Sequence, residues 1–198
     1  PMGFYAPAQI VRDAREHGVA VRPPDINASE WDCTLEPGPR AADRLHRAHA
    51  SMRDDIRATH ALRLGLRAIK GAREEEMRLL AARRGAGYDS VRDVWLRTDL
   101  PPATLERLAE ADAFASLGLS RRDALWAVKA LRRSGDKDDL PLFRAASMAE
   151  REPDAALPPM PPGQQVVADY RSLSLSLKAH PVSFLRAALA RRGVTRHL

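Results

Sequence analysis

Apolar residues recur at helical spacing along most of the chain, and strand-like alternation occurs only in short runs. The first helix is predicted over residues 7–17, because Ile10, Val11 and Ala14 share one face and Gly18 follows as a stop signal. Short strands are predicted in three places, of which the last two are expected to pair: residues 19–21, 33–35 and 60–64. A surface helix is predicted between the second and third strands from apolar residues three or four apart: Leu45, Ala48, Met52 and Ile56.

Residues 62–133 contain two helix–turn–helix units with the same layout. The first runs from Leu66 through a turn at Gly71 into a helix that ends near Arg84. The second opens at Pro101-Pro102, passes through a turn after Ala111, and resumes as a helix at Arg121. In each unit, two apolar residues three apart lead into the turn, which is typical of helix-hairpin-helix modules. Such a hairpin directs backbone N–H groups and a helix N-terminus at one point, where a phosphate oxygen fits.

These elements predict a mainly α fold with a small β element: a tandem helix-hairpin-helix domain plus short strands near the N-terminus. Four regions are predicted. Residues 1–58 carry the short strands and the inserted helix, and residues 59–135 carry the hairpins. Residues 136–163 form a proline-rich, largely extended linker, because prolines cluster at its end. Residues 164–198 form a C-terminal helical segment.

The positive charge is concentrated on the hairpins. The net charge is +6, and residues 59–134 hold 15 Lys and Arg against 10 Asp and Glu. This bias fits a polyanionic partner. The competing interpretation is that arginine, like alanine, leucine and proline, is abundant because of base composition alone.

Several classes of site find no support. The single cysteine, Cys33, excludes an intramolecular disulfide and suits a reducing cytoplasm. No apolar run reaches the ~20 residues that a membrane span needs. His46 and His49 lie three apart, but no cysteine or carboxylate set completes a metal site, so solvated histidines are preferred. No phosphate-cradling glycine loop and no nucleophile elbow is present.

Exposed basic residues beside the two turns are the candidate DNA contacts, and the glycine of the first turn is a candidate point of close backbone approach. These residues are Arg67, Lys70, Gly71, Arg73, Arg121, Arg122 and Lys129. The alternative is a solvated helix surface held by charge pairs one turn apart.

Several stretches, taken together, resemble the alpha subunit of bacterial DNA polymerase III, the C-family polymerases. Residues 3–14 and 17–27 are similar to the end of that family's fingers region, and residues 64–71 to the entry of its tandem hairpin domain. Residues 105–118 resemble its second hairpin. Residues 169–186 are more similar to the error-prone, damage-inducible alpha paralogue than to the replicative one. The chain is therefore expected to be a piece of a longer polymerase.

The resemblance implies a polymerase whose catalytic carboxylates and Mg²⁺ lie in a palm domain before this segment, so no catalytic residue or cofactor is assigned here. It also implies a clamp-binding pentapeptide after the hairpin domain. An apolar island in the linker falls at that place, with Asp139, Leu140, Leu142 and Phe143 as its candidate contacts. It keeps the two apolar anchors but lacks the usual leading glutamine. The alternative is that these apolar residues pack against the hairpin domain of the same chain and bind no clamp.

Both hairpins depart from the family's pattern. Arg73 stands where a second glycine is usual, and three glutamates follow it. In the second hairpin Asp112 replaces a glycine. A residue other than glycine is expected to fit if its φ stays negative, whereas a carboxylate beside a phosphate is repulsive. One or both hairpins are therefore candidates for packing rather than DNA binding.

The resulting hypothesis is a non-catalytic, cytoplasmic segment of an error-prone DNA polymerase that holds primer–template duplex through phosphate contacts and supports damage-induced synthesis. The alternative is a protein-interaction module that recruits the sliding clamp or mutasome accessory proteins, with the hairpins serving packing only. A hairpin-type base-excision enzyme ranks last, because no catalytic Lys or Asp follows a hairpin in a Gly-Pro-Asp context.

Overall fold

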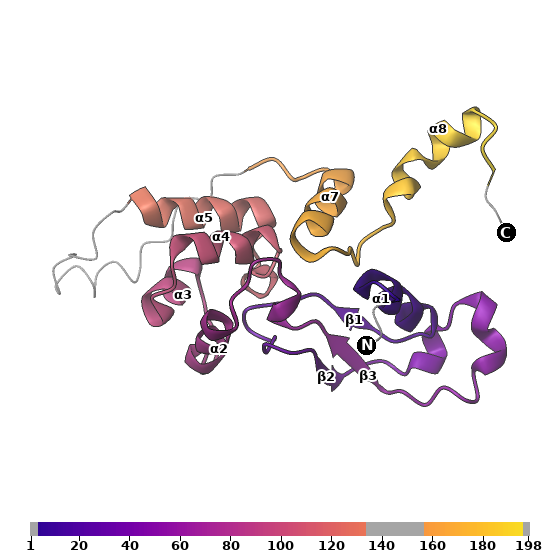
Figure 1. Ribbon diagram of the computed structural model, residues 1–198, viewed down its shortest axis with the longest axis horizontal. Coiled ribbons are helices and arrows are strands. Elements are labelled where there is room, and N and C mark those ends of the chain that lie inside the picture. Colours follow the sequence, from indigo (N-terminus) through magenta and orange to yellow (C-terminus); the bar gives the residue numbers. More distant parts are fainter. Residues whose placement is uncertain (1–3, 134–156, 196–198) are drawn as a thin grey trace.

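Helices dominate the computed structural model, which describes residues 4–133 and 157–195 (Figure 1). The N-terminal part holds one helix, α1 (Pro7–Glu16), and three short strands. The strands are β1 (Val21–Arg22), β2 (Thr34–Pro37) and β3 (His60–Arg63), in the order β1-β3-β2. The predicted mainly α fold with a small β element is confirmed, and so is the first helix, which ends one residue earlier than predicted.

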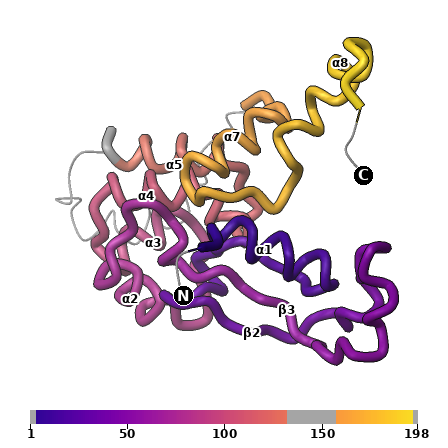
Figure 2. Tube along the Cα trace, turned by 45° about the vertical axis from the view of Figure 1, so that its right-hand side comes forward, coloured from indigo at the N-terminus to yellow at the C-terminus, as the bar shows by residue number. Residues whose placement is uncertain are grey.

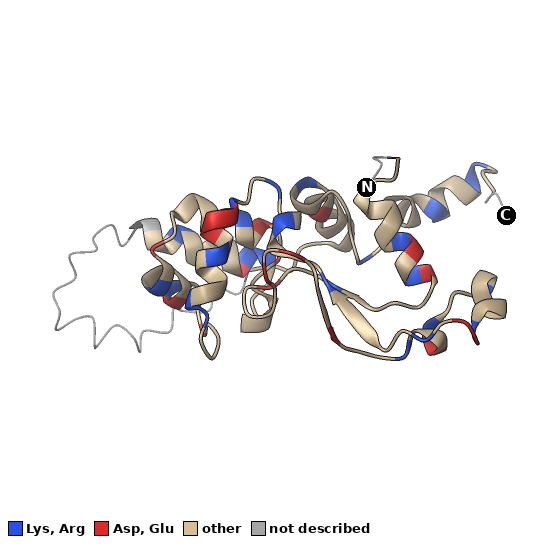
Figure 3. Ribbon diagram, turned by 60° about the horizontal axis from the view of Figure 1, so that its bottom comes forward, with Lys and Arg blue, Asp and Glu red and all other residues tan. Residues whose placement is uncertain are grey.

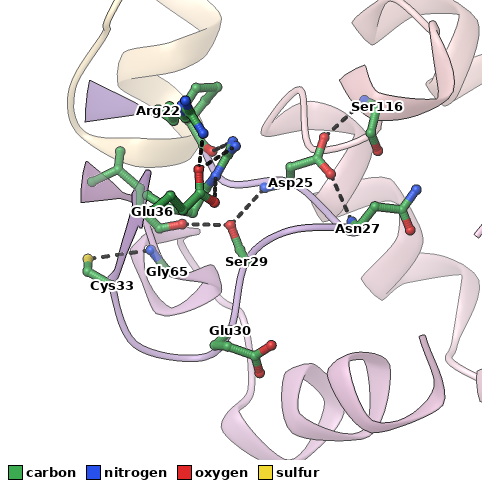
Figure 4. Close-up of polar contacts among 12 residues, drawn as sticks. Arg22, Asp25, Asn27, Ser29, Glu30, Cys33, Glu36, Gly65 and Ser116 are labelled. Atoms are coloured by element: carbon green, nitrogen blue, oxygen red, sulfur yellow. Dashed lines mark hydrogen bonds and ion pairs between the residues drawn. The ribbon is translucent and has the colours of Figure 1, made fainter. Parts of the chain in front are cut away.

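The strands pair around β3. β2 pairs with it, as predicted, and runs antiparallel with Leu35 opposite Leu62. β1 runs parallel to it with Val21 opposite the same residue. Glu36 reinforces both pairings, because its carboxylate accepts from Arg63 Nε at 2.8 Å and from the Arg22 guanidinium (Figure 4). The hydrogen bonds from Arg63 and Arg22 lower the pKa of Glu36 below its ordinary value.

The prediction of a surface helix between β2 and β3 is wrong. Two 3-10 helices occupy that region: η1 (Ala41–Arg44) and η2 (Arg47–Met52). Leu45 separates them in an extended conformation, with φ −56° and ψ 137°. The following His46 N–H donates to the carbonyl oxygen of Glu16 at 2.9 Å. The backbone is therefore tied to the end of α1, and a continuous α-helix cannot form.

Four α-helices make the hairpin region: α2 (Glu74–Arg83), α3 (Val91–Thr98), α4 (Pro102–Glu110) and α5 (Arg121–Arg133). Ser90 caps α3, since its hydroxyl accepts from Asp93 N–H at 3.0 Å. α4 opens at the predicted proline pair. α4 packs against α5, and α3 packs against both.

The C-terminal part crosses back over the hairpins. α7 (Pro162–Leu173) packs against α4. It begins inside the predicted linker, because proline fits the first turn of a helix and here starts α7 instead of keeping the backbone extended. η6 (Pro181–Leu185) and α8 (Arg186–Arg191) then project away from the body (Figures 1 and 2). The rest of the predicted linker, residues 136–156, lies outside the described part.

One hydrophobic core joins all these parts. Its most buried large side chains come from the segment after β1, from both hairpin units and from α3 and α5: Ile26, Leu66, Met77, Leu80, Val94, Leu105, Leu108, Phe114 and Val128. Val11 of α1 and Leu173 and Leu175 at the end of α7 belong to the same cluster. The relative position of the two hairpins is therefore set by shared packing.

Candidate nucleic-acid interface

The first hairpin presents an open turn. Its first helix is a single 3-10 turn, η3 (Leu66–Ala68), and α2 is its second helix. Gly71 lies between them with φ +75°, a left-handed conformation that glycine adopts without strain. Gly71 is exposed, and neither its N–H nor that of Arg73 has an acceptor among the residues that the structure describes. Two backbone donors at this turn are thus free to bind an oxygen.

Three cations surround that turn. Lys70 and Arg73 are exposed, the latter by 77% of its side chain. The third is Arg107, from α4. A Cβ at Gly71 would lie 3.4 Å from Arg107 Nε, so this guanidinium stands directly over the turn. Arg107 was not among the predicted contacts, because it lies in the other hairpin unit and no local pattern places it beside Gly71.

The acidic first turn of α2 limits where an anion can sit. Glu76 is held back on the protein, because its carboxylate accepts from Thr104 Oγ1 at 2.8 Å. Glu74 is paired with Arg78 at 2.7 Å. These carboxylates occupy the end of α2 that favours negative charge. The favourable place for a phosphate is therefore the side of the turn between Gly71 and Arg107, away from the axis of α2.

Lys70 also joins the first hairpin to α7. Its N–H donates to Ser172 O at 2.8 Å, and its Nζ donates to Tyr170 O at 3.1 Å. Both acceptors are carbonyl groups in the last turn of α7, which a cation stabilises. Among the described residues, the ammonium group meets no carboxylate.

The second hairpin has a closed turn. It runs from α4 through Asp112 and η4 (Ala115–Leu117) to α5. Ala113 N–H donates to Leu108 O, and Ser116 N–H donates to the Asp25 carboxylate at 3.0 Å (Figure 4). Ile26 N–H in turn donates to Ala113 O at 2.9 Å. The chain itself therefore supplies partners for these groups of the turn.

Asp112 corrects one expectation about that turn. A residue replacing glycine was expected to keep φ negative, but Asp112 has φ +62°. Aspartate tolerates this conformation better than most residues. Its carboxylate lies 2.9 Å from Lys178 Nζ and 3.9 Å from the Arg121 guanidinium, so protein cations, not phosphate, are its neighbours.

Two predicted contacts at the start of α5 have protein partners. The Arg121 side chain is only 5% exposed and lies 2.5 Å from the Asp169 carboxylate of α7. Arg122 donates to Pro158 O at 2.6 Å. Arg121 therefore holds α7 against the second hairpin and cannot reach a ligand in this structure. Lys129, further along α5, is exposed.

Arg67 lies apart from both turns. Its guanidinium pairs with Asp32 and stands 5.9 Å from the centre of the Trp31 ring. Both partners come from the loop before β2, so Arg67 braces that loop against η3. It remains exposed by 59% of its side chain.

The remaining predictions from the sequence concern clamp binding, metal sites and membrane spans. The proposed clamp contacts Asp139, Leu140, Leu142 and Phe143 are outside the described residues. Within the described part, no group of three His, Cys, Asp or Glu side chains is arranged to hold a metal ion. Across residues 4–133 and 157–195, no helix is both long and apolar enough to cross a membrane.

Known proteins share both the hairpins and the rest of the chain. A helix-hairpin-helix motif family matches residues 18–124. The chain is 58% identical to error-prone DNA polymerase 1 of Rhizobium meliloti (strain 1021), over 99% of this chain and 18% of that protein. It is 57% identical to the error-prone DNA polymerase of Mesorhizobium japonicum, over 98% of this chain and 18% of the relative. The corresponding enzyme of Ruegeria pomeroyi is 50% identical, over 100% of this chain and 16% of its own length.

The chain thus spans less than one fifth of the length of these curated relatives. The resemblance to error-prone C-family polymerases that the sequence indicated is confirmed over nearly the whole chain. The family match includes both turns, with Gly71 in the first and Asp112 in the second, and covers more than half of the residues. The chain therefore belongs to the helix-hairpin-helix motif family.

Proposed function

We propose that this chain is the DNA-holding segment of an error-prone DNA polymerase, and that its first hairpin binds the backbone of primer–template duplex. One observation carries the proposal. The exposed turn at Gly71 has free backbone N–H groups and lies between the cations Lys70, Arg73 and Arg107. Backbone N–H groups and cations at one point match a phosphate oxygen and carry no information about base sequence.

The second hairpin supports the first in this proposal. Arg121 and Asp112 are engaged with Asp169 and Lys178, and the turn amides of Ala113 and Ser116 are bonded within the chain. Its packing against α7 fixes Lys70 through Tyr170 and Ser172. Phosphate contacts by Arg122 and Lys129 remain predictions of the sequence, and Arg121 is omitted from the proposed surface.

A titration with two duplexes of unrelated sequence tests the proposal. We expect equal affinities for both duplexes and a steep loss of affinity as the salt concentration rises. Fluorescence anisotropy with labelled duplexes measures both quantities. Undetectable binding at low salt, or a strong preference for one sequence, would contradict it.

For the whole protein we propose template-directed DNA synthesis across damage in the cytoplasm, with Mg²⁺ and the catalytic carboxylates outside this chain. The names of the relatives and their identity to this chain support that proposal. A full-length polymerase whose Lys70, Arg73 and Arg107 are replaced by Gln should extend fewer nucleotides per binding event. Its rate of single-nucleotide addition at saturating DNA should be unchanged.

Sliding-clamp binding by Leu140, Leu142 and Phe143 is a separate proposal that rests on the sequence alone. Replacing Leu142 and Phe143 by Ala should abolish clamp binding and leave duplex affinity intact. Unchanged clamp affinity would reject it. Contacts with mutasome accessory proteins are likewise proposed from the sequence alone.

A further inference from the structure

A basic groove lies between α1 and the end of α7 with the chain that follows it. It is about 840 Å³ in volume and is lined by α1, by the segment that carries η1 and η2, and by residues 170–180. In Figures 1 and 2, α1 lies between the strands and this C-terminal segment. We propose that this groove binds a single strand of nucleic acid.

The first wall of the groove is held by close contacts. Gly18 follows α1 with φ +84°, and a Cβ there would lie 1.9 Å from Ala41 O, so only glycine lets η1 approach. The His17 and His49 rings stack with their centres 4.4 Å apart. His46 N–H bonds to the end of α1. The arginines of η1 and η2 are thereby fixed beside those of α1.

Positive charge dominates this groove. Arg15, Arg44 and Arg47 line it, are exposed, and have no acidic partner among the residues that the structure describes. Glu16 is the one carboxylate in its lining, and Arg12 Nε offsets it at 2.8 Å. Residues 1–58 carry a net charge of −1, so the local excess arises from folding. Figure 3 shows basic and acidic residues interspersed along the molecule.

Aromatic rings accompany these cations. Tyr170, His46 and His180 also line the groove, and Tyr170 is 37% exposed. In His46 and His180 the Nδ1 atom accepts a backbone N–H two residues later, which fixes each ring at the edge of the groove. Cations for phosphates with rings for bases are the combination found in sites for single-stranded nucleic acid. An acidic peptide would use the cations but not the rings, so we favour a nucleic-acid strand.

The groove adjoins the first hairpin at one residue. Lys70 Nζ binds the carbonyl oxygen of Tyr170, whose ring belongs to the groove. A strand that leaves a duplex at the first hairpin would therefore enter the groove past Tyr170. This continuity rests on the proposed function, whereas binding of an isolated single strand to the groove does not.

The test uses the complete chain and a labelled 20-nucleotide thymidine strand, with a blunt duplex as the second probe. Replacing Arg15, Arg44 and Arg47 by Glu should lower single-strand affinity about tenfold or more and make its salt dependence shallower by about two units of slope. Duplex affinity should change by less than about twofold. The matched control replaces Arg57, Arg191 and Arg192 by Glu; these exposed residues lie outside the groove, and the change in net charge is identical.

A second variant separates stacking from charge. Tyr170→Leu keeps the net charge and should lower single-strand affinity about fivefold or more, since each stacked base contributes to binding. Equal losses in the groove variant and the charge-matched control would overturn the proposal, and so would competition by poly-glutamate as effective as that by unlabelled strand. If the chain bound the single strand but not the duplex, the proposed function would be rejected, whereas the proposal for the groove would be supported.

Discussion

The Arg121 guanidinium lies 2.5 Å from the Asp169 carboxylate, and the two side chains are only 5% and 6% exposed. This pair joins the first turn of α5 to the middle of α7. Asp169 also accepts from Ser176 Oγ at 2.6 Å and faces Lys178 Nζ at 3.4 Å. A residue that the sequence assigned to DNA thus fixes the C-terminal helix on the hairpins.

Asp169→Asn should lower the free energy of unfolding by about 3–5 kcal/mol, because it leaves the buried Arg121 charge with only the Asp112 carboxylate, 3.9 Å away. Urea denaturation followed by circular dichroism measures the change. Asp32→Asn breaks the exposed pair with Arg67 and should cost less than about 1 kcal/mol. Equal costs for the two variants would show that the buried pair has no special role.

Asp112→Gly should be more stable than Asp112→Ala by about 1–2 kcal/mol. Both variants lose the ion pair with Lys178, but only alanine keeps a Cβ in the left-handed conformation at φ +62°. Thermal melts of the two variants give the comparison. If alanine proved as stable as glycine, the turn would have to adopt another conformation.

Gly71→Ala should lower duplex affinity about tenfold, because the strained turn misplaces the N–H groups that we assign to a phosphate. Gly118→Ala is the matched control, since Gly118 has φ +72° and a Cβ there would meet nothing within 4 Å. Each change should cost about 1–2 kcal/mol of stability. A loss of duplex affinity in both variants would point to general destabilisation instead.

Glu36→Gln should destabilise the protein by about 1–3 kcal/mol at pH 7, because it removes the charged acceptor of Arg63 and Arg22. The pKa of Glu36 is lowered in the folded state, so its stabilising effect is present above the unfolded pKa of about 4.3 and is lost as the pH falls through the folded value. The difference between the variant and the parent should therefore shrink as the pH falls below about 4. Urea titrations at several pH values test this, and a constant difference would contradict it.

Local patterns predicted the elements that local interactions form. The helix at Pro7–Glu16 and the pairing of β2 with β3 follow from spacing and alternation. The surface helix between β2 and β3 was wrong, because the bond from His46 N–H to Glu16 O joins residues thirty positions apart and overrides helical spacing.

The candidate site was less predictable for the same reason. Sequence alone located Gly71 and Lys70 at a turn, but Arg107 reaches that turn only through the packing of α4. Arg121 looked like an exposed helix-start cation until α7 supplied Asp169, 48 positions later. The basic groove joins residues of α1, η1 and the C-terminal segment, and residues 1–58, which supply most of its arginines, carry no positive excess in the sequence.

The salt dependence of duplex binding tests the central claim most directly. Replacing Lys70, Arg73 and Arg107 together by Gln should make the slope of log affinity against log salt shallower by about two to three, because each neutralised phosphate adds about 0.9 to that slope. The same change at Arg57, Arg191 and Arg192 should leave the slope unaltered. An unchanged slope in the first variant, with a reduced slope after replacement of Arg122 and Lys129, would show that the second hairpin holds the DNA and would contradict the account.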